Sequence, residues 1–218
     1  MNKSIELPQA TIQALKDGAT SIIVPMGNMS KGLERREALS KHFVYKEYFD
    51  EFISAHSPLQ AGDKDVFVKE EFMCINSEYF YKEEYTQGNY KVEPSFNVWD
   101  SLENAIDKHQ PSSQMTKEQS RFNIDIEDVR IVRVQDIDFD TKQDIFPYQR
   151  IIQCYDEEQF ANDDFIDKFN NLIQEYEDKH FTETGERISL GNYEDNPYVF
   201  LYDAKVTTKE FYKEPKDK

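Results

Sequence analysis

Hydrophobic and polar residues alternate most clearly over residues 121–126, where Phe122, Ile124 and Ile126 alternate with Arg, Asn and Asp. A period of two predicts a strand with one buried face. The pair 127–128 is acidic and interrupts the alternation, and a second β-branched run follows at 129–134. We therefore expect two strands joined by a bend or hairpin. The preceding residues are polar and turn-rich, which predicts a site beside the first strand.

The rest of the chain predicts a mixture of helices and strands. Residues 7–16 have helical spacing and precede Gly18, which suits a helix C-cap, and residues 21–26 form an apolar run typical of a buried strand. The turn residues at 62–63 lead into a strand at 66–68. Residues 137–149 are acidic and are expected to be irregular. An amphipathic helix is expected to begin at Asn162 or Asp163, and a last strand at 198–202 is expected to be buried on both faces.

These elements predict the α+β class and one domain spanning residues 1–218. A chain of 218 residues is long enough to bury a large core. Helical insertions are expected at about 27–55 and 160–182, and residues 209–218 are expected to be a frayed tail.

Composition narrows the functional classes. The net charge of −17 opposes unspecific binding to nucleic acid unless the cations gather on one face. Cys74 and Cys154 lack metal-ligand spacing and are interpreted as free thiols in a reducing compartment, with a disulfide as the alternative. The four histidines are scattered, so we expect neither a metal site nor a cofactor. The sequence contains no run of about 18 apolar residues and no leader pattern, which predicts a cytoplasmic protein that is not in the membrane.

Individual polar residues have a functional and a structural interpretation. Glu70, at the end of the strand at 66–68, can serve as a general acid or base or accept a hydrogen bond from a base, or it can be a solvated carboxylate. Arg121 can grip a phosphate or carboxylate, or form a structural salt bridge. Lys69 and Lys117 can add positive potential to the same cleft, or they can be exposed lysines without a specific role. Ser120 and Gln114 either contact base edges or cap the turn. Stacking on bases is one interpretation of Tyr79, Phe80, Tyr81 and Tyr85, but a place in the core or its cover is favoured.

Four segments, in order, resemble the ASCH (activating signal cointegrator homology) family of PUA-like domains, particularly its phage and prophage members. Residues 14–21 are similar to the helix-to-strand element, and residues 62–70 to the Gly-Asp strand ending in Glu. Residues 112–121 with the strand pair after them are similar to the central segment. Residues 196–199, Asn-Pro-Tyr-Val, resemble the closing strand.

The resemblance implies a PUA-like mixed β-barrel surrounded by helices, with a cleft for a nucleobase or nucleotide. Family members include RNA-binding proteins, amidohydrolases of acetylated cytidine and ribonucleases. Glu70, Ser112, Met115, Ser120 and Arg121 match the family pattern in this sequence, whereas Thr20 stands where the family has its motif lysine. That lysine is needed for the amidohydrolase chemistry.

The leading hypothesis is therefore a binding protein for a nucleotide, a modified nucleoside or RNA, without the usual catalytic lysine. A first alternative is an enzyme, a nucleoside amidohydrolase or ribonuclease-like hydrolase, with Glu70 as general base and Thr20 or Ser21 positioning water. A second alternative is an acidic module that binds a basic protein or mimics DNA. The expected ligand-binding residues are Lys69, Ser112, Gln114, Lys117, Ser120 and Arg121.

Overall fold

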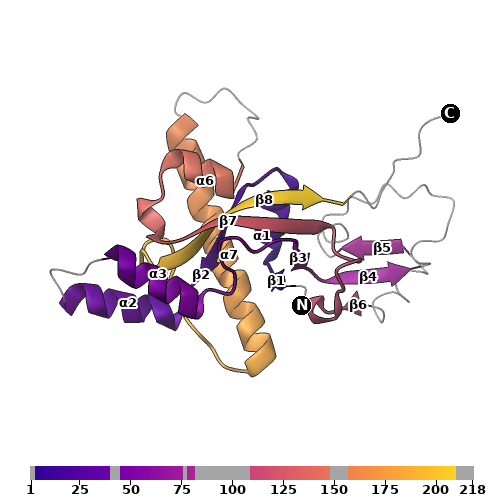
Figure 1. Cartoon of the computed structure of the whole chain (residues 1–218), viewed down its shortest axis with the longest axis horizontal. Coiled ribbons are helices and arrows are strands. Elements are labelled where there is room, and N and C mark those ends of the chain that lie inside the picture. The colour runs from indigo at the N-terminus through magenta and orange to yellow at the C-terminus, as the bar shows by residue number, and fades with distance from the viewer. Residues whose placement is uncertain (1–2, 40–44, 76–77, 82–108, 148–156, 210–218) are drawn as a thin grey trace. The chain divides into compact units, whose positions relative to one another are not determined.

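The computed structural model describes residues 3–39, 45–75, 78–81, 109–147 and 157–209 (Figure 1). These residues form a mixed α+β fold with five α-helices and two sheets, as expected for the class. The strand order of the larger sheet is β1 (Ser4–Glu6), β3 (Val66–Lys69), β7 (Phe122–Arg133), β8 (Tyr198–Thr208) and β2 (Ser21–Pro25). Among the described strands β1 and β2 lie at opposite ends of this order, so the sheet is not closed into a barrel.

The chain divides into two compact units. Unit 1 comprises residues 1–9, 65–124 and 207–218, and unit 2 comprises residues 10–64 and 125–206. The strands β7 and β8 each continue from one unit into the other. The expected single domain stays a prediction, and the expected frayed tail lies, except for Lys209, outside the described residues.

Unit 1 is built from short strands. Strand β1 pairs in parallel with β3, and β3 pairs antiparallel with the start of β7, where Val66 lies opposite Ile124. A smaller sheet is formed by β4 (Phe72–Ile75), with β5 (Glu78–Tyr81) on one side and β6 (His109–Gln110) on the other. Because β3 ends at Lys69 and β4 begins at Phe72, Glu70 lies in a two-residue connection between the two sheets of this unit.

Unit 2 begins with helix α1 (Gln9–Lys16), whose Gln9 is the last residue of unit 1. The helix is followed by Gly18 at a φ of 98°, a conformation that glycine adopts readily. Strand β2 then pairs antiparallel with β8, with Ile23 opposite Leu201. Both residues are buried, as are Ile22 in β2 and Phe200 and Tyr202 in β8. The helix, the glycine stop and the buried strand agree with the sequence prediction, and β8 is longer than expected, ending at Thr208.

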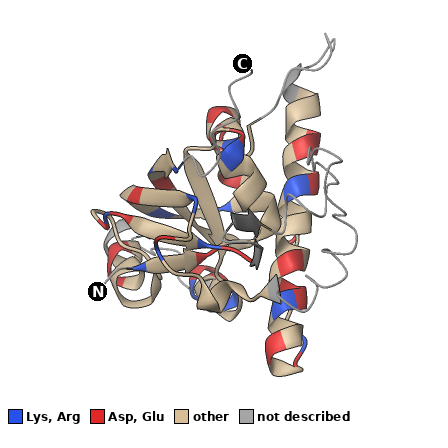
Figure 2. Cartoon of the chain, turned by 90° about the vertical axis from the view of Figure 1, so that its right-hand side faces the viewer, with Lys and Arg blue, Asp and Glu red and all other residues tan. Residues whose placement is uncertain are grey.

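The remaining helices of unit 2 are α2 (Asn28–Leu39), α3 (Tyr45–His56), α6 (Phe139–Ile145) and α7 (Glu157–Thr184). Helix α6 contacts both β2 and α7. Helix α7 buries one face through Ala161, Phe165, Phe169 and Leu172, and bands of Asp and Glu recur along it (Figure 2). Its apolar spacing confirms the predicted amphipathic helix. Within the described chain, no helix combines the length and hydropathy needed to cross a membrane.

The predicted division into two strands, joined at residues 127–128 by a bend or hairpin, is wrong. Residues 122–133 form one continuous strand, β7, in which Phe122, Ile124 and Ile126 are buried before the acidic pair and Val129 and Ile131 after it. The buried positions are even-numbered first and odd-numbered afterwards. The two exposed acidic residues therefore mark a change of the buried face near the boundary between the units, and not a reversal of the chain.

Two helix predictions also need correction. The acidic region expected to be irregular contains α6, which is capped by Asp138, whose side chain accepts a hydrogen bond from the Thr141 amide. Helix α7 begins at Glu157 and not at Asn162. The Asn162 side chain does not cap the helix, because its Oδ1 accepts a hydrogen bond from the Lys142 ammonium at 2.7 Å. A short polar residue inside a helix was therefore mistaken for its start.

Candidate functional site

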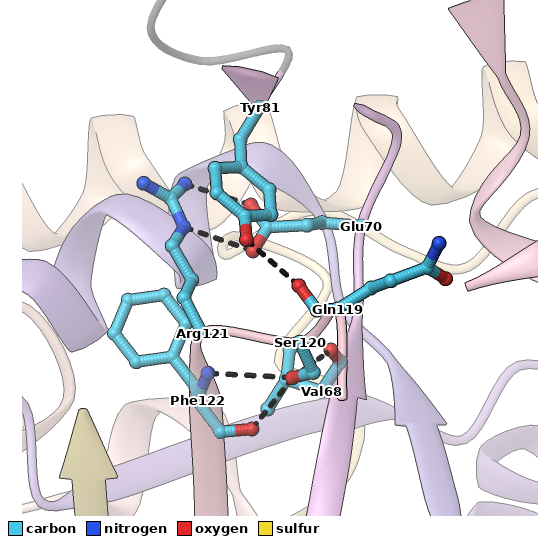
Figure 3. Close-up of polar contacts among 7 residues, drawn as sticks. All are labelled: Val68, Glu70, Tyr81, Gln119, Ser120, Arg121 and Phe122. Carbon is cyan, nitrogen blue, oxygen red and sulfur yellow. Dashed lines mark hydrogen bonds and ion pairs between the residues drawn. The ribbon is translucent and has the colours of Figure 1, made fainter. Parts of the chain in front are cut away.

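The centre of unit 1 is a buried ion pair between Glu70 and Arg121 (Figure 3). The Arg121 Nε donates to Glu70 Oε1 at 2.9 Å, and its Nη2 donates to Oε2 at 2.7 Å. The side chains are only 8% and 3% exposed for Arg121 and Glu70. The predicted salt-bridge interpretation of Arg121 therefore describes what the side chain does here, and its partner is another residue of the predicted site.

The Glu70–Arg121 ion pair combines strong hydrogen bonds with a large desolvation penalty. Two planar groups joined by two parallel hydrogen bonds form the strongest common type of ion pair in proteins. Moving both charges out of water has a large desolvation penalty, so a buried ion pair adds little net stability. Removing only one of the two charged side chains is strongly destabilising, because the other charge stays buried. Both carboxylate oxygens of Glu70 face the guanidinium. For Glu70 to act as a general base, this pairing would first have to be broken.

Aromatic rings surround the guanidinium. The Arg121 Cζ lies 4.4 Å from the centre of the Tyr81 ring and 5.3 Å from that of Phe122. The Tyr81 hydroxyl donates to the backbone carbonyl of Gln119 at 2.7 Å (Figure 3). Tyr81 is 2% exposed and clusters with Phe72 and Met115. The sequence interpretation of this tyrosine was core or cover, and no local pattern indicated its contact with the Arg121 guanidinium.

The serines of the predicted site are used inside the protein. The Ser120 hydroxyl lies within hydrogen-bond distance of two carbonyl oxygens, those of Val68 at 2.7 Å and Phe122 at 2.8 Å, and the residue is fully buried. Ser112, in the 3-10 turn η2 (Ser112–Gln114), donates its hydroxyl to Glu6. Both side chains hold the segment before β7 in place. Gln114 is exposed.

The two predicted lysines of unit 1 lie nearer the surface. Lys117 forms an ion pair with Asp65, whose other oxygen accepts a hydrogen bond from the Asn123 amide at 2.8 Å. The Asn123 Oδ1 is buried and has no hydrogen-bond partner. Asp65 adopts a φ of 55°, an uncommon value for a residue other than glycine. Lys69 lies 5.7 Å from the centre of the Phe67 ring.

Thr20 and Ser21 belong to unit 2, so their grouping with Glu70 of unit 1 stays a prediction. Thr20 is exposed, and its amide donates to the Asp144 carbonyl at 2.9 Å. The Ser21 hydroxyl donates to Asp203 Oδ1 at 3.3 Å. Arg130 donates to both oxygens of Asp203, at 2.8 and 2.9 Å. A carboxylate engaged in this way is a poor base for activating the serine hydroxyl.

Unit 2 also buries a lysine that the sequence did not indicate. Lys142 on α6 is 8% exposed, and its ammonium donates to Asn162 and lies 3.4 Å from the Tyr193 hydroxyl. It also lies 5.3 Å from the centre of the Phe165 ring. Over the residues that the structure covers, no carboxylate forms an ion pair with Lys142. The charge is held by an amide and aromatic rings, which are weaker partners than a carboxylate.

No group of three or more metal-ligating side chains occurs among the residues whose positions are described. Cys74 lies in β4, and Cys154 is outside the described residues, so the interpretation of both cysteines as free thiols stays a prediction. Comparisons of the chain with protein-family models, curated proteins and solved structures each found no match. Unit 1 contains seven of the predicted site residues, namely Lys69, Glu70, Ser112, Gln114, Lys117, Ser120 and Arg121.

Proposed function

We propose that the protein binds a nucleobase-containing ligand, a nucleotide, a modified nucleoside or an RNA end, through the part of unit 1 centred on Glu70 and Arg121. The observation that carries this proposal is the buried, doubly hydrogen-bonded pair of these residues beside the Tyr81 ring. A carboxylate, a guanidinium and an aromatic face are the groups that recognise the amino and carbonyl edges and the flat surface of a base.

The proposal includes the ASCH-type assignment with a PUA-like fold, and a cytoplasmic location. Its support is the order of the four sequence segments. Two of these segments supply Glu70 and Arg121, which are 51 residues apart and in direct contact. A binding role is preferred over hydrolysis because the carboxylates of Glu70 and Asp203 are each engaged by an arginine, at two oxygens in both cases.

Calorimetric titration of the purified protein with nucleosides, acetylated and methylated nucleosides, nucleotides and short RNA tests the proposal. A ligand at about 100 times its dissociation constant stabilises the fold by roughly 2.7 kcal/mol, so a thermal-shift screen selects the ligands to titrate. The decisive variant is Arg121→Lys, which keeps the charge and removes the planar fork. We expect it to weaken binding by roughly tenfold or more, the loss of a charged hydrogen bond.

The matched control is Arg130→Lys in unit 2, because Arg130 also holds a carboxylate at two oxygens. It is expected to leave the affinity unchanged. Absence of binding by every ligand, or equal effects of the two variants, would contradict the proposal. In that case, salt-dependent capture of a basic protein becomes the experiment that decides for the acidic-module alternative.

A further inference from the structure

The segment 111–119, which we call the lid, contacts Tyr81, the ring that lies over the guanidinium of the Glu70–Arg121 pair. It lies between β6, which ends at Gln110, and the buried Ser120 that precedes β7. Most of its residues are exposed, whereas Met115 is only 3% exposed and clusters with Phe72 and Tyr81. The lid thus presents a polar outer side and a single large apolar side chain to the interior of unit 1.

The backbone of the lid is bonded mainly to itself. Gln114 N–H donates to the Pro111 carbonyl at 3.0 Å, Met115 N–H to the Ser112 carbonyl at 3.0 Å, and Gln119 N–H to the Thr116 carbonyl at 3.1 Å. These bonds close two consecutive turns and do not depend on either sheet. The lid can therefore move as a pre-formed piece without losing its own hydrogen bonds.

Side chains provide contacts from the lid to the rest of unit 1. Lys117 pairs with Asp65, Ser112 with Glu6, and the Tyr81 hydroxyl donates to the Gln119 carbonyl. The Lys117 and Asp65 side chains are 24% and 54% exposed, and ion pairs this close to solvent contribute little stability. By contrast, Ser120 is fully buried and bonded to Val68, so it marks a fixed end for the lid.

We infer that the lid opens to admit the ligand and that Met115 occupies the place of a flat ring against Tyr81 in the closed state. Counted over backbone and side chain together, Glu70, Arg121 and Tyr81 are 4%, 6% and 2% exposed, so a ligand of nucleobase size reaches them only if a covering segment moves. Met115 is one of the two residues clustered with Tyr81, so its displacement uncovers part of the ring that contacts the Arg121 guanidinium. This inference depends on the proposed function for the identity of the ligand, but the opening itself does not require a ligand.

Methionine oxidation measures the opening in the full chain without ligand. The protein is treated with dilute hydrogen peroxide, and sulfoxide formation at Met115 is followed by peptide mass spectrometry. Met26 in unit 2 is 2% exposed and serves as an internal reference for global unfolding. Met115 is expected to oxidise faster than Met26. Lys117→Ala should raise the oxidation rate of Met115 by roughly two- to five-fold, the effect of losing a surface ion pair. The oxidation rate of Met26 should stay unchanged.

The control variant is Lys64→Ala, because Lys64 forms a comparable exposed ion pair with Asp125 at 3.5 Å. It should change neither rate. Equal rates for Met115 and Met26 in the wild-type protein would overturn the lid, as would equal acceleration of Met115 by both lysine variants. Fast oxidation of Met115 in a protein that binds no nucleoside or RNA would retain the lid and reject the proposed function. Nucleoside binding together with equal oxidation rates of Met115 and Met26 would support the proposed function and reject the lid.

Discussion

The guanidinium of Arg121 faces the carboxylate of Glu70 through two hydrogen bonds, and both side chains are almost completely removed from solvent. If one of the two side chains is removed, the charge of the other stays buried and is not fully hydrated. The pair therefore makes unit 1 sensitive to single substitutions at its centre, independently of any ligand.

Single substitutions of the pair should be strongly destabilising. We expect Glu70→Gln and Arg121→Met each to lower the free energy of unfolding by about 3–5 kcal/mol, because each leaves one buried charge without its partner. The double variant should lose less than the sum of the single losses. Urea unfolding of the four proteins measures the coupling. The comparison pair is Arg130 and Asp203, whose side chains are 44% and 35% exposed and whose coupling should be about 0–1 kcal/mol. Additive losses at Glu70 and Arg121 would contradict the prediction.

Tyr202 should make the fold sensitive to alkaline pH. Burial raises the pKa of its phenol to about 12 from an ordinary value of 10.0. The hydroxyl lies 2.8 Å from Ser57 Oγ, and since Ser57 donates to the Leu59 carbonyl at 2.6 Å, Tyr202 is the donor. The raised pKa means that the stabilisation is complete below pH 10 and is lost as the pH rises towards 12.

Unfolding measured from pH 9 to pH 12 should therefore show a loss of stability that is smaller in Tyr202→Phe. The difference between the proteins over this range is expected to be roughly 2–3 kcal/mol, the equivalent of two pKa units. Tyr198 also has a pKa raised to about 12, by burial and by its contact with Glu37, so it continues to contribute in the variant. Parallel curves for the two proteins would mean that the Tyr202 phenol titrates equally in the folded and unfolded states.

Asn162 should contribute to the stability of the fold, because its side chain accepts a hydrogen bond from the buried ammonium of Lys142. Asn162→Ala is expected to destabilise the protein by about 1–3 kcal/mol, since Lys142 loses its 2.7 Å acceptor. In a Lys142→Met background the same substitution should have a much smaller effect, because methionine retains the apolar stem and removes the charge. Thermal and urea unfolding provide the measurement. An unchanged effect in that background would show that Asn162 acts through the helix and not through Lys142.

Local sequence patterns were sufficient to predict the helices and strands that bury the same face along their whole length. The strand β2 and the stop at Gly18 followed from apolar runs and a single glycine. The strand β7 was divided wrongly because Glu127 and Asp128 resemble a turn, and only the partners on both sides of the strand show that the chain continues. Helix α6 was missed because its acidic composition outweighed the cap at Asp138.

The candidate site was predictable residue by residue, but not as an arrangement. Glu70 and Arg121 were both selected, and nothing local indicates that residues 51 positions apart form a pair. Ser120 and Ser112 were selected as ligand contacts, whereas the structure directs their hydroxyls to internal acceptors. Spacing along a chain identifies which side chains face one side of a strand, while their partners depend on pairing between distant segments.

Unit 1 is assembled from three separate stretches of the chain, including residues 1–9 and 207–218. The amide of Lys209 donates to the carbonyl of Arg121 at 2.7 Å, so the end of β8 joins a strand start made much earlier. During translation, this contact forms only after residue 209 has left the ribosome exit tunnel. Contacts between distant segments slow folding. The nascent protein must therefore carry Glu70 and Arg121, two charges destined for burial, until residue 209 has been made and their surroundings can be completed.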